Sequence, residues 1–263
     1  MNECLNTIKV MWFYGKHTLI MYALTIIGLY FYWDPHYLVF TLIGYFLFGM
    51  FGLEIAHHRY FSHKTFTCSR PTELFLTFCA CFCGTGDPLY WSGIHRAHHA
   101  HSDTDKDVHQ PHTQPFLSWL HANDRSNIEI DWSRVKDLAK KDELLFLAHH
   151  WPKIYYGTIA LFWLINPQLG LFFIVLPGVL TLALTGAVNV VSHKHGYRNY
   201  NSNDTSTNNK ILNIFIFGGG YHNNHHGRPG SYTTKLHDHE IDVSGWVIKH
   251  WLADTVNTGH LPK

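Results

Sequence analysis

The sequence has little charge for its length. Asp, Glu, Lys and Arg make up 15% of its 263 residues, whereas they make up about 25% of an average soluble domain. The formal net charge is only +1, so bulk electrostatics give no support to a nucleic-acid partner, and we expect none. Cysteine is also scarce, and three of the five copies alternate in CACFC at 79–83. This spacing is not Cys-x-x-Cys, and we interpret these residues as small apolar packing groups.

Charged side chains are almost absent from two long windows. Only Asp34 is charged between residues 17 and 53, and no Asp, Glu, Lys or Arg lies between 154 and 193. A membrane-spanning helix needs about 20 apolar residues, so each window can hold two, with breaks at Pro35 and Pro167. We therefore predict an all-α integral membrane protein with four transmembrane helices, at about 17–33, 36–56, 147–165 and 168–191. The alternative, a soluble protein with very hydrophobic core helices, is disfavoured by the pairing of the windows.

The remaining segments are predicted to share one side of the membrane. The two short turns between spans carry no Lys or Arg. Because Lys and Arg accumulate on the cytoplasmic side, we expect both termini to be cytoplasmic, with segments 57–146 and 192–263 forming a helical cap there. The apolar stretch 74–86 is too short to span and is predicted to be an interfacial helix. We expect the chain, 1–263, to form a single domain without a cleaved signal peptide.

Histidine is the abundant residue type, with 23 copies. Four groups lie at or just beyond the predicted cytoplasmic face, in HRYFSH (58–63), HRAHH (95–99), SHKH (192–195) and HNNHH (222–226). Side chains three or four residues apart project from one face of a helix, so HRAHH and HNNHH can each direct two or three imidazoles toward one point. The candidate ligands are His58, His63, His95, His98, His99, His193, His222, His225 and His226.

These histidines predict two metal ions. Neutral imidazole suits iron, zinc, copper and nickel, and nine imidazoles exceed the roughly four to six ligands of one ion. Carboxylates can orient ligand imidazoles. The candidates for this role are Glu54, near the end of a predicted span, and Asp103 and Asp105, with Asp107 beside them. A solvated acidic loop is the alternative for the three aspartates.

The other histidines are interpreted as surface or interfacial residues, or as neighbours of the ligands. The first class comprises His17, His36, His109, His112, His121, His149, His150, His237, His239, His250 and His260. The second class comprises His57, His101 and His195, which adjoin the candidate ligands.

The histidine motifs resemble the histidine boxes of the membrane fatty acyl desaturases. HRYFSH (58–63), HRAHHAHSDTD (95–105), NVVSH (189–193) and YHNNHH (221–226) follow in the order of that family, and SHKHGYRNY followed by DTSTNN is similar to its bacterial members. The resemblance runs from about residue 40 to 245. It implies a four-span fold with a cytoplasmic cap around two iron ions. It also implies that the nine histidines are ligands and that Asn189 acts through a metal-bound water.

The activity implied by this resemblance is O2-dependent desaturation. The expected substrate is a saturated fatty acyl chain carried by coenzyme A or a lipid, and the expected product has a cis double bond of the delta-9 type. We expect no fused cytochrome b5-like domain in the chain, so electrons would come from a separate donor of the ferredoxin or cytochrome b5 type. The apolar chain would be drawn from the bilayer and positioned beside the oxidant.

The helix before His58 contains candidate tunnel residues, and the segment before the last histidine box departs from the family's usual sequence. Leu42, Phe46 and Met50 lie sixteen, twelve and eight residues before His58, on roughly one helix face, and could line and close an acyl tunnel, as similar positions do in the family. Ordinary helix packing is the alternative. The last box is preceded by Gly218–Gly220, where members of the family often have Gly-Glu-Gly. The chain therefore lacks, at position 219, the carboxylate that could orient a neighbouring histidine in those relatives.

Two other functions remain open at this point. A lipid hydroxylase or ketolase would use the same iron chemistry but add oxygen to carbon, and the box spacing favours a desaturase. A His-rich metal transporter or metal-binding membrane protein would not be an enzyme. A transporter places polar ligands near the middle of the membrane, whereas these histidines gather at one face.

Overall fold

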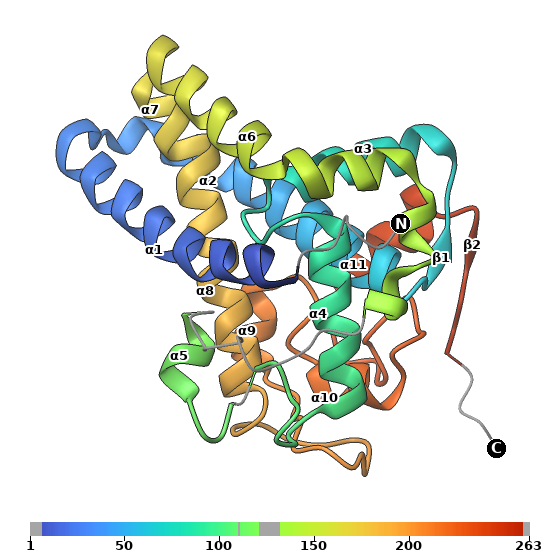
Figure 1. The fold of residues 1–263 in the computed structure, drawn as a ribbon. Coiled ribbons are helices and arrows are strands. Elements are labelled where there is room, and N and C mark those ends of the chain that lie inside the picture. Colours follow the sequence, from blue (N-terminus) through green and yellow to red (C-terminus); the bar gives the residue numbers. More distant parts are fainter. Residues whose placement is uncertain (1–6, 110, 121–131, 260–263) are drawn as a thin grey trace.

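The computed structural model describes residues 7–109, 111–120 and 132–259, in which the chain is almost entirely helical (Figure 1). Within these residues the single sheet has two short antiparallel strands, β1 (Phe66–Thr67) and β2 (Thr255–Val256), with Phe66 opposite Val256. The sheet ties the end of the chain to the segment that follows the first histidine motif.

The long helices follow the predicted apolar windows. α1 (Thr7–Tyr32) is followed by the turn η1 (Pro35–Tyr37), α2 (Leu38–Gly44) and the π-helical η2 (Tyr45–Ser62). The Asp34 side chain accepts the His36 backbone N–H and so starts η1. In the second window, α6 (Asp142–Ile165) is followed by α7 (Pro167–Leu169), η5 (Gly170–Val175) and α8 (Leu176–Val191). Both predicted breaks are therefore present.

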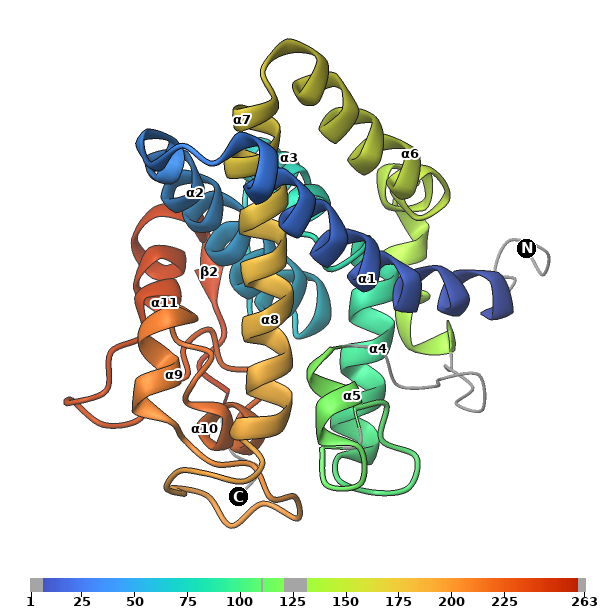
Figure 2. The same ribbon diagram turned by 90° about the vertical axis from the view of Figure 1, so that its left-hand side faces the viewer.

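Two of the described helices are long and apolar enough to cross a membrane. They are Pro35–Ser62 and Pro167–Val191, judged by length and composition. The other two predicted spans fall within α1 and α6, and as membrane spans they stay predictions. In Figures 1 and 2, α6 and α7 lie at one end of the molecule, and α8 runs from there toward α5 and α10 at the other end.

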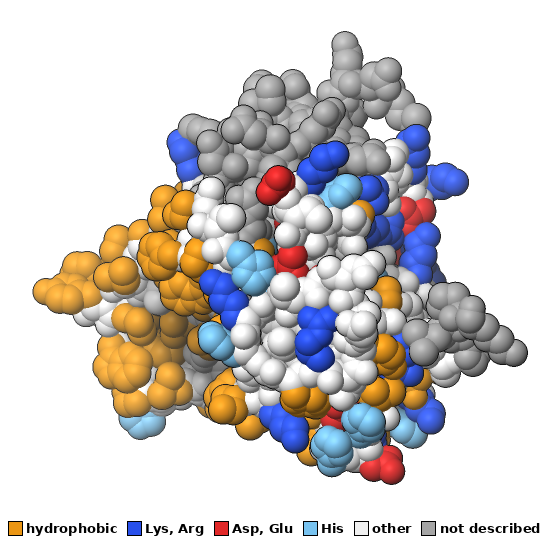
Figure 3. Space-filling model, turned by 90° about the horizontal axis from the view of Figure 1, so that it is seen from below, with side chains coloured by type: hydrophobic (Ala, Val, Ile, Leu, Met, Phe, Trp, Pro, Cys, Tyr) orange, Lys and Arg blue, Asp and Glu red, His pale blue; other side chains and the backbone are white. Residues whose placement is uncertain are grey.

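Large apolar side chains are exposed on the long helices. Examples are Ile26 on α1, at 69% exposure, and Leu164 at the end of α6, at 85%. Figure 3 shows hydrophobic side chains gathered at the side of the molecule where these helices lie. Contiguous exposed apolar surface of this kind marks a membrane or protein contact.

The buried core lies between the long helices and α3 (Arg70–Phe82). Trp151 of α6 is fully buried, stacks on Tyr155 and donates its indole N–H to the backbone oxygen of Cys81. Cys79 and Cys83 are also fully buried, which confirms that the alternating cysteines are packing residues. α3 begins at Ser69, whose side chain accepts the Thr72 N–H, and it covers most of the predicted interfacial segment.

The segments predicted to form the cap consist of shorter elements joined by loops. Their helices are α4 (Pro88–His101), α5 (Pro115–Trp119), η3 (Trp132–Val135), η4 (Leu138–Lys140), α9 (Lys210–Phe215), α10 (His222–Gly227), α11 (Val243–Val247) and η6 (Ile248–Leu252). α4 is the longest of them and begins at Asp87, whose carboxylate accepts the N–H groups of Leu89 and Tyr90. α4 and α10 carry the two H-x-x-H-H motifs, and α8 ends close to them in Figure 2.

Candidate metal centre

Four separate elements bring the candidate histidines together. His58 and His63 lie at the end of η2, and His193 follows the end of α8. The three histidines of HRAHH lie on α4, and those of HNNHH lie on α10. Because each motif is helical, its i, i+3 and i+4 side chains share one face, as their spacing predicted.

The first cluster of imidazoles contains His58, His63, His95 and His225, with all four ligand atoms within 4.8 Å of one another. The Nε2 atoms of His58 and His225 are 3.0 Å apart, and those of His63 and His95 are 2.7 Å apart. His99 adjoins this cluster, because its Nε2 lies 3.1 Å from that of His95 and 2.8 Å from that of His225.

The second cluster contains His98, His193, His222 and His226, again with ligand atoms within 4.8 Å of one another. The Nε2 atoms of His193 and His222 are 3.1 Å apart. The Nε2 atoms of His98 and His226 are buried and have no hydrogen-bond partner among the described residues. A buried polar atom of this kind needs a partner, and a metal ion at the centre of the cluster would provide one.

Carboxylates lie behind four of the imidazoles. The Nδ1 atom of His98 is 2.9 Å from Asp107, that of His193 is 3.1 Å from Asp103, and that of His226 is 2.6 Å from Asp204. In the first cluster, His58 Nδ1 is 3.3 Å from Glu54. An acceptor at Nδ1 holds the proton there and leaves the Nε2 lone pair for a metal.

The structure thus brings Glu54 and Asp103 to the histidines, as expected, but not Asp105. Asp105 is exposed, because the loop after α4 turns it to solvent, and the buried Asp107 faces His98 instead. Asp204 was not predicted. It lies 22 residues before His226, and no local spacing rule relates the two positions.

The electrostatics of the clusters favour neutral imidazoles. Burial lowers the pKa of His222 and His225 well below the usual value, and neighbouring imidazoles lower it further. Burial also lowers the pKa of His226 to about 4, although Asp204 opposes this shift. Burial would raise the pKa of Asp103, but hydrogen bonds from His193 and Thr205 outweigh it and lower the pKa to about 2. Neutral imidazole is the form that binds metals, so these residues fit two metal ions.

Asn189, expected to act through a metal-bound water, is buried at the end of α8, where its amide lies 3.2 Å from His109 Nδ1. The surface interpretation of His109 is wrong, because this residue is buried and its ring lies 4.8 Å from that of His98. His17 is also buried, and its ring nitrogens lie 2.7 Å from the Tyr156 hydroxyl and the Gly84 carbonyl. Neither position carries a local signal, since only packing of distant segments encloses them.

Most of the other histidines are placed as expected. Those exposed on the surface include His36, His112, His149, His195, His237, His239 and His250, whereas His101 and His150 are half-buried. His57 is fully buried against Trp91. His121 and His260 lie outside the described residues.

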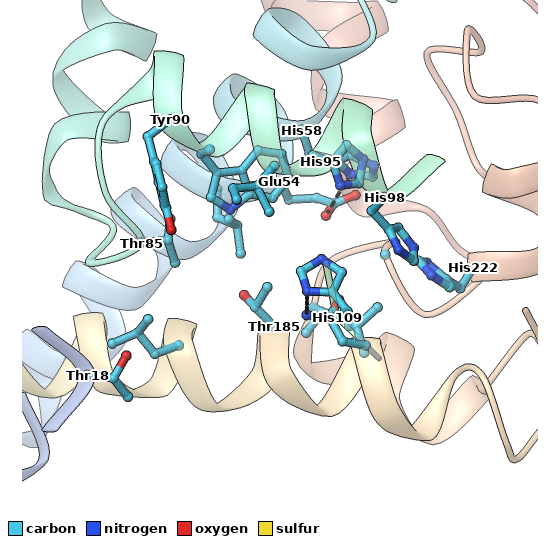
Figure 4. A pocket seen from close by; sticks show the side chains of 18 of the residues that line it. Thr18, Glu54, His58, Thr85, Tyr90, His95, His98, His109, Thr185 and His222 are labelled. Atoms are coloured by element: carbon cyan, nitrogen blue, oxygen red, sulfur yellow. Dashed lines mark hydrogen bonds and ion pairs between the residues drawn. The ribbon is translucent and has the colours of Figure 1, made fainter. Parts of the chain in front are cut away.

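A pocket leads from the clusters between α4 and α8 (Figure 4). Its metal end includes His58, His95, His98 and His222, and Figure 4 shows Thr18, Thr85 and Tyr90 toward its other end. The rest of its lining includes the apolar side chains of Leu53, Trp91, Ile94, Leu182 and Val188. The pocket therefore has a lining that suits an apolar chain with one segment beside the imidazoles.

The three residues expected to line an acyl tunnel do not line this pocket. Leu42 is 70% exposed, Phe46 packs its ring against Phe217, and Met50 is buried in the core between η2 and its neighbours. The reason is geometric. The pocket passes Leu53 and Glu54 and continues toward α1, so positions further back along α2 and η2 lie away from it.

Comparison with known proteins identifies the same family from most of the chain. The profile of the fatty acid desaturase family matches residues 33–242. The chain is 34% identical over 242 residues to icosanoyl-CoA 5-desaturase of Limnanthes douglasii, covering 88% of this chain and 67% of that protein. It is 30% identical over 258 residues to sn-1 stearoyl-lipid 9-desaturase of Anabaena variabilis, covering 93% and 90%. It is 27% identical over 235 residues to delta-9 acyl-lipid desaturase 2 of Arabidopsis thaliana, covering 84% and 72%.

Proposed function

The chain belongs to the fatty acid desaturase family and is an oxidoreductase that desaturates fatty acids; on this premise, we propose that it forms a cis double bond at a pair of iron ions held by its two imidazole clusters. The observation that carries the proposal is the convergence of two buried, four-histidine clusters at one end of an apolar pocket. His99 would complete the first cluster, and Asn189 would contact the second ion through a water molecule.

The proposed reaction converts a –CH2–CH2– unit to –CH=CH– and consumes one O2, two electrons and two protons, releasing two water molecules. When bound, the iron ions supply the oxidising chemistry that activates O2. The chain's own residues do the rest. Asp103, Asp107 and Asp204 hold the protons on the Nδ1 atoms of their histidines and thereby direct the Nε2 atoms inward. Ile94 and Leu182 exclude water and hold the methylene pair beside the imidazoles.

The length of the pocket supports a double bond at the delta-9 position. Tyr90 and His98 are eight residues apart on α4, which corresponds to about 12 Å of helix. An extended acyl chain advances about 1.3 Å per carbon, given C–C bonds of about 1.5 Å, so this segment accommodates about nine carbons. An 18-carbon chain desaturated at carbon 9 has eight carbons beyond the double bond, whereas a 20-carbon chain desaturated at carbon 5 has fourteen. The first matches this segment more closely, and its methyl end would lie near Thr18 and Thr85.

The proposed location is the membrane. The family and the two apolar helices suggest a membrane protein. We extend this to four spans at about 17–33, 36–56, 147–165 and 168–191, in a single domain whose histidine-bearing cap and termini are cytoplasmic. The exposed apolar side chains of α1 and α6 support the two additional spans.

The proposed partners are a fatty acyl substrate and a protein that donates electrons. Relatives named for both acyl-CoA and acyl-lipid desaturation support an acyl chain on either carrier. A donor of the ferredoxin or cytochrome b5 type would supply the two electrons that the balanced reaction needs.

The test is the fatty-acid methyl ester profile of a desaturase-deficient host that expresses this chain with an electron donor. The matched variants are His98→Ala, in the second cluster, and His36→Ala, at an exposed histidine outside both clusters. We expect a new monounsaturated acid whose cleavage products place the double bond at carbon 9, lost with His98→Ala and kept with His36→Ala. A hydroxy acid in place of the alkene would overturn the proposal.

A further inference from the structure

Gly219 lies directly against a buried carboxylate. A Cβ atom at this position would be 2.9 Å from Oε2 of Glu54, which is closer than side-chain atoms normally approach. The backbone of Gly219 does not have the left-handed conformation that favours glycine, unlike that of Gly218 at φ +123°. The restriction at position 219 is therefore one of space and not of backbone conformation, and the carboxylate end of Glu54 takes that space.

The two oxygens of Glu54 have different neighbours. Oε1 accepts hydrogen bonds from Nε and Nη2 of Arg59, at 3.1 and 2.8 Å. Oε2 faces Gly219 and lies 3.3 Å from Nδ1 of His58. Glu54 and Arg59 are both buried, and a buried charge is tolerated when it is paired in this way. The Arg59 contact thus fixes the carboxylate in an orientation that leaves Oε2 for His58. Figure 4 shows the Glu54 carboxylate beside His58.

The first imidazole cluster depends on this one carboxylate. Asp103, Asp107 and Asp204 all lie behind histidines of the second cluster. Among the contacts of the described residues, Glu54 is the acid that reaches an imidazole of the first cluster. Its partner His58 is a central member, because the His58 Nε2 atom is 3.0 Å from that of His225.

We propose that Glu54 is the positioning residue of the first cluster, directing the His58 Nε2 atom toward its metal ion, and that Gly219 is present to admit the Glu54 carboxylate. The carboxylate that position 219 lacks is thus supplied from η2. This inference rests on the proposed function only in requiring that the first cluster holds iron. It makes Glu54 and Gly219 a matched pair, so that changing both has a different outcome from changing either.

The experiment compares Glu54→Ala, Gly219→Glu and the double variant with the wild type. In Gly219→Glu, two carboxylates compete for one buried space. In the double variant, the space that Glu54 leaves can receive the carboxylate of the new side chain, beside His58 and Arg59. The matched control is Glu73→Ala, which also removes a buried carboxylate paired with basic side chains, Arg70 and Lys141, but not next to a histidine.

The readouts are iron per chain in detergent-purified protein, the rate of iron loss to a chelator, and the Mössbauer spectrum of 57Fe-loaded protein. We expect two irons in the wild type and in Glu73→Ala. Glu54→Ala should bind one of the two irons about 10- to 100-fold more weakly, Gly219→Glu should also lose iron, and the double variant should regain it.

Glu54→Gln, which keeps the shape of the side chain, should change one of the two Mössbauer subspectra and leave the other unchanged, even if the alanine variants do not fold. Two tightly held irons in Glu54→Ala, unchanged subspectra in Glu54→Gln, or a double variant no better than the single variants would each refute the pairing alone. A wild-type chain without iron would instead refute the proposed function and this inference with it.

Discussion

Asp107 offers a direct test of how the second cluster is held, because the exposed Asp105 is a matched control two residues away on the same loop. Asp107 is fully buried and lies 2.9 Å from His98 Nδ1. Its Oδ1 also accepts the His109 backbone N–H, and its Oδ2 accepts that of Asp103 at 2.7 Å. Burial would raise the pKa of Asp107, but the neighbouring histidines hold it well below the usual value, so the carboxylate is charged.

Replacing this carboxylate with an amide should weaken metal binding markedly. In Asp107→Asn one oxygen becomes an NH2 group, which leaves either His98 and the His109 N–H, or the Asp103 N–H, without an acceptor. A hydrogen bond to a charged group contributes about 1.5–3 kcal/mol, and about 1.4 kcal/mol corresponds to a factor of ten. We therefore expect Asp107→Asn to lower iron affinity about 10- to 100-fold.

The assay is competition for Fe(II) with a chelator of known affinity, on detergent-purified protein, followed by the fatty-acid profile of the expressing host. Asp105→Asn removes the same charge from the same loop without a contact to an imidazole, so it should match the wild type in both measurements. If the two asparagine variants bind iron equally well, the carboxylate does not orient His98 and the reasoning is wrong.

Three further predictions concern the pocket, the core and the dependence of stability on pH. Thr18→Leu should shorten the pocket and shift the products from 18- toward 16-carbon acids, whereas Phe46→Ala, outside the pocket, should leave the chain-length profile unchanged. Trp151→Ala should cost about 3–5 kcal/mol of unfolding free energy and lower the thermal midpoint, while Trp246→Ala, at an exposed residue, should change stability by less than about 0.5 kcal/mol. Burial alone would raise the pKa of Asp242, but the neighbouring Arg59 guanidinium and the hydrogen bonds to the carboxylate outweigh burial and lower the pKa below its usual value. The stability that it contributes is therefore present above about pH 4, the unfolded pKa, and lost below it. Asp242→Asn should flatten the fall in thermal midpoint between about pH 5 and 3, and an unchanged slope would contradict this assignment.

The long helices and the grouping of imidazoles on helix faces could be predicted from the sequence, because apolar windows and histidine spacings are local features. A run without charge predicts a long helix wherever it packs, and the breaks at Pro35 and Pro167 are present in the structure. In the same way, the H-x-x-H-H spacing on α4 and α10 directs imidazoles to one side of each helix before any tertiary contact forms. The motif set also pointed to the correct family, which the comparisons with known proteins show over residues 33–242.

The residues that line the pocket could not be predicted from local spacing. The i, i+4 rule placed Leu42 and Phe46 on the His58 face of one helix, but it contains no information on which neighbours enclose that face. In the structure the cavity is bounded by α4 and α8 and continues toward Thr18 on α1. The burial of His109 has the same origin, because it depends on the approach of Asn189, 80 residues further along the chain.

The sequence by itself therefore determined the helical character, the family and the set of imidazoles, since these follow from periodicity and motif spacing within short segments. Only the tertiary structure decided how the imidazoles divide into two clusters and which carboxylates support them. Asp204 and His226 are 22 residues apart, and Asp103 and His193 are 90 apart. Contacts at such separations arise from the packing of whole helices and loops, in which Asp105 and Asp107, two residues apart, face opposite environments.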